Sequence, residues 1–184
     1  MKLSSLVRRL LVPRVVVTAY YFLKSRSLVS LKAEVELSPM LTFGRGCTVG
    51  SFTKIKATDG PLRIGDRSGI ATGCFLSAQE GGLEIGDNFI CGPNVNIVGS
   101  NYVFDRPDVH LEDQGYTSKG IKIGRNVWVG AGTTILDGSV IGSNTIVVAN
   151  SLVNRRFPPN CILQGNPARI ILRRNLQDAE KQEE

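Results

Sequence analysis

The single histidine of this chain, His110, lies in a stretch whose composition suits acid–base chemistry. Residues 100–119 read SNYVFDRPDVHLEDQGYTSK, and they combine four acidic and three aromatic residues with that histidine. Histidine changes its protonation state near neutral pH, so it is the side chain that most often takes a proton from a hydroxyl or an amine. Asp105 or Asp108 would orient its ring in that role. A surface histidine without a role is the alternative, and the sequence leaves both open.

This stretch interrupts a six-residue repeat that runs through most of the chain. A helix repeats about every 3.6 residues and a single strand about every two, so neither explains a period of six. The repeat is typical of a parallel β-helix, in which short strands form the walls of a prism and bury one aliphatic ladder per wall. Glycines that follow the repeat are expected to supply the backbone conformations of the corners. The repeating residues, which we call core positions, are Leu37, Phe43, Val49, Ile55, Ile64, Ile70, Leu76, Ile85, Cys91, Ile97, Ile123, Val129, Ile135, Ile141, Val147 and Val153.

The four cysteines fall on core positions, on the small positions two residues earlier, or on the C-terminal continuation of the repeat: Cys47, Cys74, Cys91 and Cys161. No CxxC pair occurs, so we expect small buried apolar side chains rather than disulfides or a metal site. With only one histidine, we expect no metal cofactor. Free cysteines also suit a cytoplasmic protein.

The largest interruption lies between Ile97 and Ile123, where a step of 26 residues replaces the usual six. The additional residues, roughly Ser100 to Lys119, must project from the prism. Loops longer than about 12–15 residues are uncommon unless they are functional or disordered. The aromatic residues argue against a disordered linker, so this loop is expected to pack against something.

Residues directly before core positions point outward, because side chains alternate across a strand. One wall is predicted to present Thr48, Gly69, Ile90, Trp128 and Ile146. The last three would form an exposed apolar stripe beside the base of the long loop. Such a patch marks either a subunit contact or a ligand groove.

The positive charge is concentrated at the N-terminus. The net charge is +6, whereas residues 1–33 hold no acid and seven cations: Lys2, Arg8, Arg9, Arg14, Lys24, Arg26 and Lys32. The rest of the chain is therefore close to neutral, and no nucleic-acid partner is expected. The apolar run LLVPRVVVTAYYFL is shorter than the ~20 residues that span a bilayer. A helix here would either lie on an anionic membrane surface or pack on the prism or a neighbouring subunit, and these alternatives are compatible.

Three segments resemble the hexapeptide-repeat acyltransferases: IKIGRNVWVGAGTTILDGSVIG (121–142), IVVANSLVNRRFPPNCILQGNPARII (146–171) and NYVFDRPDVHLEDQG (101–115). In particular, these segments resemble galactoside and maltose acetyltransferases and the O-acetyltransferases of bacterial surface polysaccharides. The resemblance covers about residues 35–173. It implies an all-β, left-handed parallel β-helix that forms a homotrimer, with acetyl-CoA as acyl donor and active sites between subunits.

The resemblance also implies which residues contact the donor. By residue-wise match, the CoA arm would be lined by Trp128, Gly130, Ala131, Ala149, Asn154, Arg155 and Arg169. Either arginine beside a CoA phosphate would form a charge-assisted contact. Ordinary surface arginines are the alternative.

The chain departs from these relatives where they carry Asn-His, because it reads Asn101-Tyr102. A neutral tyrosine is a poor base near pH 7. His110 would then act as a substitute base, or Tyr102 would take part with an altered acidity, or neither residue would act and the chain would be an impaired relative that still binds CoA or a sugar.

The sequence thus predicts an N-terminal helical segment (1–34), an acyltransferase β-helix (35–173) with the loop 100–119, and a charged C-terminal helix or tail (174–184). The expected function is acetyl-CoA-dependent O-acetylation of a sugar hydroxyl in surface polysaccharide or glycoconjugate biosynthesis. Amino-sugar N-acetylation and a catalytically impaired trimer are the alternatives. The expected location is the cytoplasm, either free or in peripheral contact with the cytoplasmic face of the membrane through residues 1–33.

Overall fold

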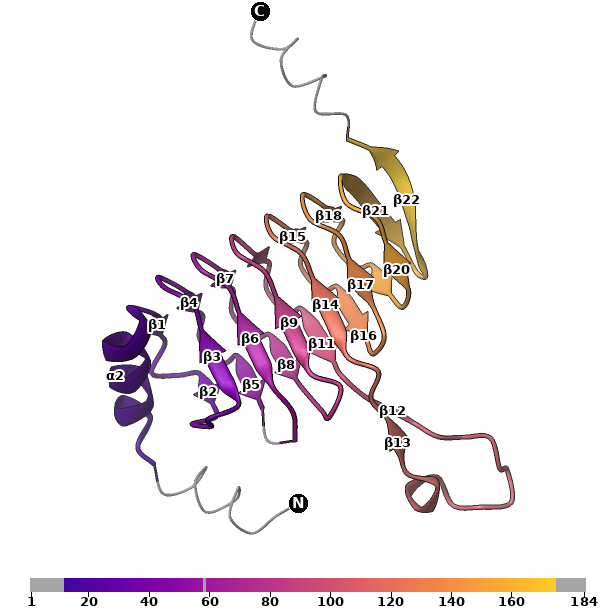
Figure 1. Cartoon of the computed structure of the whole chain (residues 1–184), viewed down its shortest axis with the longest axis horizontal. Coiled ribbons are helices and arrows are strands. Elements are labelled where there is room, and N and C mark those ends of the chain that lie inside the picture. Colours follow the sequence, from indigo (N-terminus) through magenta and orange to yellow (C-terminus); the bar gives the residue numbers. More distant parts are fainter. Residues whose placement is uncertain (1–11, 58, 175–184) are drawn as a thin grey trace, which may run out of the picture.

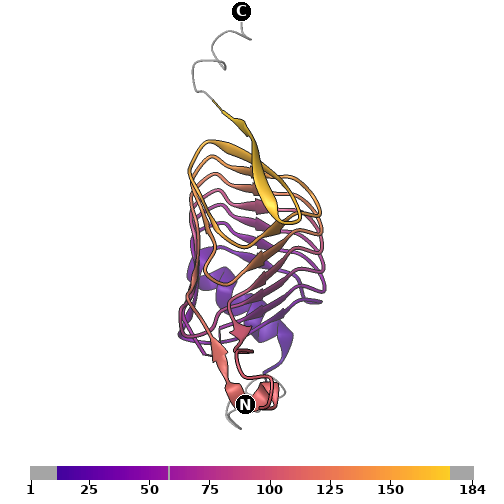
Figure 2. The same ribbon diagram turned by 90° about the vertical axis from the view of Figure 1, so that its right-hand side faces the viewer.

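Strands of two or three residues alternate with short corners along most of the chain, as the six-residue repeat predicts. The computed structural model describes residues 12–57 and 59–174. Successive strands belong in turn to three sheets, which we call the first, second and third walls (Figures 1 and 2). Each passage around the three walls makes one coil of a prism. The chain is therefore an all-β parallel β-helix.

The walls are built from parallel neighbours, except for the final antiparallel pair of the first wall. The first wall contains β1 (Leu28–Val29), β4 (Thr48–Val49), β7 (Gly69–Ile70), β10 (Ile90–Cys91), β15 (Trp128–Val129), β18 (Ile146–Val147), β21 (Cys161–Gly165) and β22 (Ala168–Arg173). The second wall contains β2 (Glu34–Val35), β5 (Lys54–Lys56), β8 (Phe75–Ser77), β11 (Asn96–Val98), β16 (Thr134–Leu136) and β19 (Leu152–Val153). The third wall contains β3 (Leu41–Phe43), β6 (Leu62–Ile64), β9 (Leu83–Ile85), β14 (Ile121–Ile123), β17 (Val140–Ile141) and β20 (Arg156–Phe157).

The core positions point into the prism and stack in register from coil to coil. Each fully buried side chain of this size stabilises the fold by about 1.5–3 kcal/mol relative to exposure. Leu37 and Phe43, at the N-terminal end, are only partly buried. The ladder of the second wall consists of Ile55, Leu76, Ile97, Ile135 and Val153, all fully buried.

All four cysteines are buried and free, which confirms their prediction as small apolar side chains. The sulfur atoms of Cys74 and Cys91 lie 3.9 Å apart without a disulfide. The hydrogen bond that Cys91 shares with Cys74 and burial together raise the pKa of the Cys91 thiol. Burial likewise raises the pKa of the Cys47 thiol.

The corners differ from the expectation that glycines after core positions supply special backbone conformations. Gly130 keeps an ordinary φ, but a Cβ placed on it would lie 2.4 Å from the backbone nitrogen of Ala149 in the next coil. It is therefore needed for close approach of the coils. Left-handed φ values occur instead at corner asparagines such as Asn126 and Asn144, at 54° and 58°. Asparagine tolerates this region better than most residues, and the Asn126 amide donates to Asn144 at 3.0 Å.

The N-terminal helix α2 (Arg14–Ser25) lies across the N-terminal end of the prism (Figure 1). Its buried residues, Val17, Tyr21 and Ser25, recur every four positions and so form one helical face. The Tyr21 hydroxyl donates to the Glu36 carbonyl at 2.9 Å. The helix ends at Arg26, whose φ of 55° turns the chain into β1.

The helix thus falls within the predicted segment 1–34, although residues 1–11 lie outside the described residues. The β-helix begins before the predicted boundary at residue 35, because β1 and β2 already stack in the walls. For example, the Leu28 N–H donates to the Cys47 carbonyl at 2.8 Å. At the other end, β22 is the last described strand, and the predicted tail beyond residue 174 lies outside the described residues. No helix within 12–57 or 59–174 has the length and hydropathy needed to cross a bilayer.

Replacing Tyr21 by Phe is expected to lower the free energy of unfolding by about 1 kcal/mol, because it removes the hydrogen bond from α2 to the Glu36 carbonyl. Tyr20→Phe is the matched control, since the Tyr20 hydroxyl accepts only an exposed hydrogen bond from Lys24. That variant should change stability by less than about 0.5 kcal/mol. Urea unfolding measures both values, and equal effects would mean that Tyr21 does not anchor the helix through its hydroxyl.

Candidate functional site

The long interruption forms a hairpin that projects from the prism (Figure 1). It consists of β12 (Asn101–Tyr102), the short 3-10 helix η1 (Leu111–Gln114) and β13 (Tyr116–Thr117), with β12 and β13 antiparallel. The prediction of a projecting loop after Ile97 is therefore confirmed. Its aromatic side chains are exposed, Phe104 by 74% and Tyr102 by 59%. The packing expected of the loop is thus not made on its own prism.

Hydrogen bonds from one side chain hold the hairpin in a defined shape. The Gln114 side-chain oxygen accepts from the Arg106 N–H at 3.0 Å, and its amide nitrogen donates to the carbonyls of Arg106 and Val109, both at 2.9 Å. Gln114 thereby ties η1 to the segment of the loop that precedes it. The loop is an ordered element able to present side chains at fixed places.

The base of the loop is fixed by a buried carboxylate. The Lys119 N–H donates to both carboxylate oxygens of Asp137 at 2.8 Å, and the Gly120 N–H donates to one of them at 2.9 Å. Asp137 is only 7% exposed. The Ser118 hydroxyl adds a bond to the Gly99 carbonyl at 2.7 Å and so links the two ends of the loop.

The three residues considered for catalysis are all exposed on this loop. Asn101 and Tyr102 lie in β12 near the base, with Tyr102 opposite Tyr116. His110 directly precedes η1, and its carbonyl accepts from the Asp113 N–H at 3.0 Å. Within the described residues, neither Asp105 nor Asp108 hydrogen-bonds to the His110 ring, so the orienting acid proposed from sequence is not in place in this chain.

Most of the residues predicted to contact CoA gather along one edge of the prism. We call the corner between the first and second walls the first edge. Trp128 lies on β15, Gly130 and Ala131 follow that strand, and Ala149 follows β18 in the next coil. Arg169 lies on β22 opposite Gln164, beside the continuation of this edge. The small side chains leave backbone groups accessible there, since Ala131 and Ala149 are exposed.

Asn154 and Arg155 lie elsewhere, at the corner between the second and third walls, which we call the second edge. The long loop leaves and re-enters the prism at this same edge, between β11 and β14. A single chain therefore does not bring His110 together with the residues of the first edge. The second wall separates the two groups.

The predicted apolar stripe forms on the first wall, because Ile90, Trp128 and Ile146 are neighbours in register. Ile90 and Trp128 are each 55% exposed. Its predicted place beside the loop base is wrong, since the loop leaves from the second edge, which lies opposite the first wall. The count of hexads identified the wall but not the edge at which the interruption falls.

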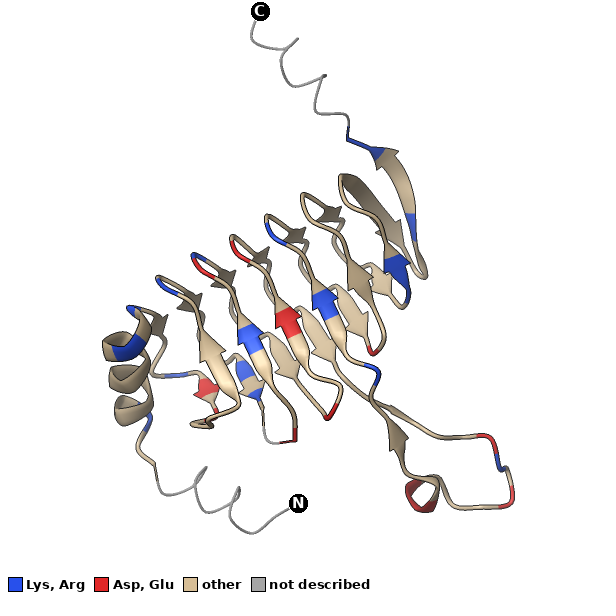
Figure 3. Ribbon diagram, viewed as in Figure 1, with Lys and Arg blue, Asp and Glu red and all other residues tan. Residues whose placement is uncertain are grey.

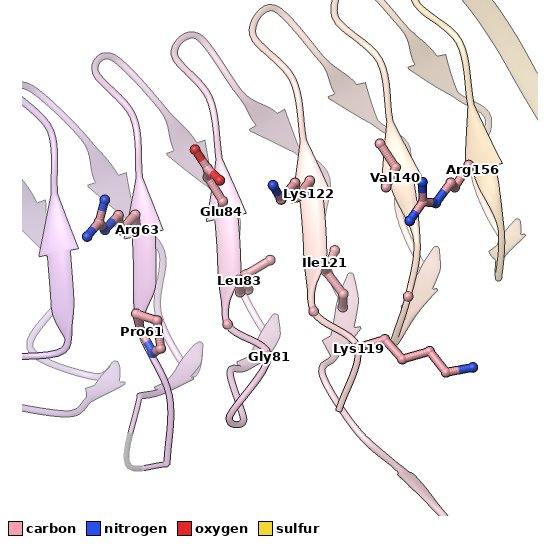
Figure 4. Close-up of a pocket in the computed structure, with 13 residues that line it drawn as sticks. Pro61, Arg63, Gly81, Leu83, Glu84, Lys119, Ile121, Lys122, Val140 and Arg156 are labelled. Carbon is pink, nitrogen blue, oxygen red and sulfur yellow. The ribbon is translucent and has the colours of Figure 1, made fainter. Parts of the chain in front are cut away.

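A groove on the third wall runs beside the loop base (Figure 4). Arg63, Glu84, Lys122 and Arg156 project from β6, β9, β14 and β20, and Lys119 extends from the loop base. Figure 3 shows the same order of charges along these strands. With four cations and one acid, this groove favours an anionic group. The sequence reading did not consider it, because charges on an outward face are usually only solvated.

Sequence reasoning also missed Gln114 and Asp137. Asp137 had a detectable signal, since the equivalent corners of earlier coils carry Ala57, Ala78 and Gly99. An acid in that series indicates a special corner. Gln114 had no comparable signal. Among the described residues, no group of three or more His, Cys, Asp or Glu side chains is arranged to hold a metal ion.

Comparisons with known proteins show what this chain is similar to. The family model of the bacterial transferase hexapeptide (six repeats) matches residues 120–155. The galactoside O-acetyltransferase of Escherichia coli is 35% identical over 99 residues, which cover 54% of this chain and 47% of that protein. The resemblance to the hexapeptide-repeat acyltransferases is confirmed.

Two further matches extend over most of the chain. WbbJ of Escherichia coli, assigned as a lipopolysaccharide biosynthesis O-acetyl transferase, is 25% identical over 178 residues, covering 92% of this chain and 87% of that protein. The structure of a mutant of AntD, an N-acyltransferase from Bacillus cereus in complex with dTDP and coenzyme A, has a TM-score of 0.74 at 22% identity, covering 90% of this chain and 92% of that one. At that identity the likeness is one of fold. The chain spans about half the length of the curated relatives that it matches first.

Proposed function

We propose that this protein is an acetyl-CoA-dependent O-acetyltransferase that modifies a sugar hydroxyl in the synthesis of a surface polysaccharide or related glycoconjugate. The observation that carries the proposal is the sequence match to WbbJ over almost the whole chain, together with the match to a galactoside O-acetyltransferase. The projecting loop with the only histidine adds the acid–base group that such a transfer needs.

The first edge suits the donor. Ala131 and Ala149 follow one another there as exposed small residues, so an extended thioester arm would lie flat against the backbone. Trp128 offers an exposed apolar surface, and Arg169 offers a cation for a phosphate group. Bound acetyl-CoA would supply the acetyl group, whose carbonyl carbon is attacked by the acceptor oxygen while the carbon–sulfur bond breaks.

His110 would take the proton of the attacking hydroxyl and later return it to the CoA sulfur. Backbone N–H groups along the edge would stabilise the oxyanion that forms on the acetyl carbonyl. Because the two groups of residues lie on opposite edges of the second wall in one chain, we propose that a site combines the first edge of one subunit with the loop of its neighbour. A homotrimer of left-handed prisms would provide three such sites and cover the exposed stripe at Ile90 and Trp128.

The cytoplasmic location remains part of this proposal. The four free, buried thiols suit a reducing compartment.

N-acetylation of an amino sugar is a second candidate, and the groove on the third wall is compatible with it. Arg63, Lys122 and Arg156 would hold the phosphate of an acceptor carried on a nucleotide. The same groove would also hold a sugar carried on a lipid phosphate, so it does not by itself decide between oxygen and nitrogen as the acceptor atom. A trimer that binds CoA or sugar without turnover is the third candidate, because Tyr102 stands where relatives carry histidine.

The test is CoA release from acetyl-CoA by the full chain, followed with a thiol reagent, against which the buried cysteines give little background. Acceptors are neutral sugars with free hydroxyls and nucleotide-linked amino sugars. An acetyl ester in the product supports O-acetylation. An acetamide in the product would show that the protein is instead an N-acetyltransferase, the second candidate. If the protein binds CoA but releases none from acetyl-CoA with any of these acceptors, the result supports the binding trimer instead.

Arg169→Ala is expected to raise KM for acetyl-CoA roughly 10- to 100-fold with kcat little changed, because a charge-assisted contact to a phosphate contributes about 1.5–3 kcal/mol in the ground state and in the transition state alike. Arg125→Ala, at an exposed corner between β14 and β15, is the matched control and should leave KM unchanged. Steady-state CoA release measures both. An Arg169→Ala enzyme with native KM would show that the donor does not reach β22.

A further inference from the structure

Helix α2 is apolar on the face that it turns away from the prism. Its buried residues, Val17, Tyr21 and Ser25, already pack on the first coils. At about 100° per residue, the opposite face is formed by Val15, Val16, Ala19, Phe22 and Leu23. Val15 is 61% exposed and Leu23 is 78% exposed. A helix that faces water normally carries polar residues on its outward face. The outward face of α2 therefore has the composition of a surface that contacts an apolar partner.

Cations paired with aromatic rings surround this face. Lys24 lies over the Tyr20 ring at 5.3 Å, and Arg26 lies over the Phe22 ring at 5.7 Å. On the neighbouring corner, Lys32 lies over Phe52 at 5.8 Å, and Phe52 is 67% exposed. Apolar residues, aromatic rings and long cationic side chains together are the composition of segments that lie at a membrane–water interface.

The charges on the helix and in the sequence that flanks it have a single sign. Residues 12–33 contain no acid, and the first one along the chain, Glu34, forms an ion pair with Lys54 at 3.4 Å. A second copy of this chain docking through the same face would bring Arg14, Lys24 and Arg26 close to their own counterparts. An anionic surface would instead be attracted by all of them, with each cation near a lipid surface contributing about 1 kcal/mol.

We propose that the outward face of α2 binds the surface of an anionic phospholipid membrane. The helix has 12 residues and is about 18 Å long, so it lies in the interface rather than crossing the bilayer. Because α2 lies across the end of the prism, the membrane covers that end, and the coils extend away from it (Figure 1). The projecting loop and the third-wall groove stay open to substrate. The inference does not depend on which acceptor or acyl donor the protein uses.

Leu23→Glu tests the apolar half of this proposal. The full chain should co-sediment with vesicles of phosphatidylglycerol and phosphatidylcholine and bind pure phosphatidylcholine vesicles much more weakly. Because one buried leucine contributes about 1.5–3 kcal/mol, Leu23→Glu should weaken binding to the anionic vesicles at least tenfold. Leu172→Glu is the matched control, since Leu172 is 55% exposed on β22 at the other end of the prism, and it should bind normally.

The electrostatic half is tested with Lys24→Gln combined with Lys32→Gln. Each change should weaken binding roughly fivefold, and the double variant should also reduce the salt dependence. Arg125→Gln, which lies several coils away, is the control for charge and should have no effect. Failure of the native chain to bind anionic vesicles overturns the proposal, as does native binding by both the Leu23 and the lysine variants. If Leu23→Glu instead lowers the mass measured by light scattering, the face is a contact between copies of this chain and the membrane assignment is wrong.

Discussion

A His110→Ala variant is expected to lose roughly 100- to 10,000-fold in kcat for acetyl transfer, which is the usual contribution of a positioned general base. The variant lacks the imidazole that would take the proton of the attacking hydroxyl. KM for acetyl-CoA should change little, because the residues proposed to hold the donor lie on the first edge and on β22. Initial rates of CoA release at saturating acetyl-CoA measure the effect.

Glu112→Ala is the matched control, since Glu112 is an exposed neighbour on η1 and has no assigned role. Its kcat should equal that of the native chain. Tyr102→Phe separates the two candidate bases, because it removes only a hydroxyl. If Tyr102→Phe abolishes turnover while His110→Ala retains it, Tyr102 is the base and the assignment of His110 is wrong.

Tyr102→His addresses the impaired-relative alternative. It restores the pattern of the relatives at the start of the loop. If the native chain has no activity and Tyr102→His gains it, the protein is a disabled acetyltransferase whose loop still has the right shape. If the native chain is active, Tyr102→His should have at most a small effect, because a base is already supplied by His110.

The prism was predictable because its core has one simple requirement. Every sixth residue must fill the interior, and the stack of Ile55, Leu76 and Ile97 meets it without exception. The first-wall stripe was predictable for the same reason, since alternation along a strand places Trp128 outward whenever Val129 points inward.

The corners were less predictable, because they combine two requirements that sequence does not separate. Glycine allows both a close approach of two backbones and a left-handed φ. The glycines that follow core positions were therefore predicted to adopt special φ values, whereas they allow close approach. The structure assigns close approach to Gly130 and the left-handed φ to residues such as Asn126 and Asn144. The asparagines are frequent in the repeat, but only their φ values show what they do.

The site was predictable only as two separate parts. The length of the interruption identified the loop, and similarity to known sequences suggested the donor residues. Which edge each part occupies depends on counting walls through the breaks near residues 58 and 80, and a change of one wall moves a residue to another groove. For that reason the stripe was placed beside the loop base, whereas β11 and β14 show that the loop leaves from the opposite edge.

Asp137→Ala is expected to show how strongly the loop depends on the prism beneath it. The change leaves the N–H groups of Lys119 and Gly120 without their acceptor in a site that is nearly closed to water. Each unsatisfied buried donor costs about 1–3 kcal/mol, so the loss of the acceptor for both should lower the free energy of unfolding by about 2–6 kcal/mol. Urea unfolding measures this loss, and Asp137→Asn should recover part of it because the amide oxygen still accepts one hydrogen bond.

The same variant should also lower kcat by at least tenfold, while KM for acetyl-CoA stays near the native value. Lys119 and Gly120, which would lose their acceptor, connect the loop to β14 and so set the position of His110. Asp66→Ala is the matched control. The Asp66 carboxylate also accepts a corner N–H, that of Arg45 at 2.8 Å, but at a corner between the third and first walls of an early coil. It should lose stability without losing kcat. If both variants reduce kcat in proportion to stability, Asp137 acts only on folding. If Asp137→Ala alone reduces kcat, the buried carboxylate positions the loop for catalysis.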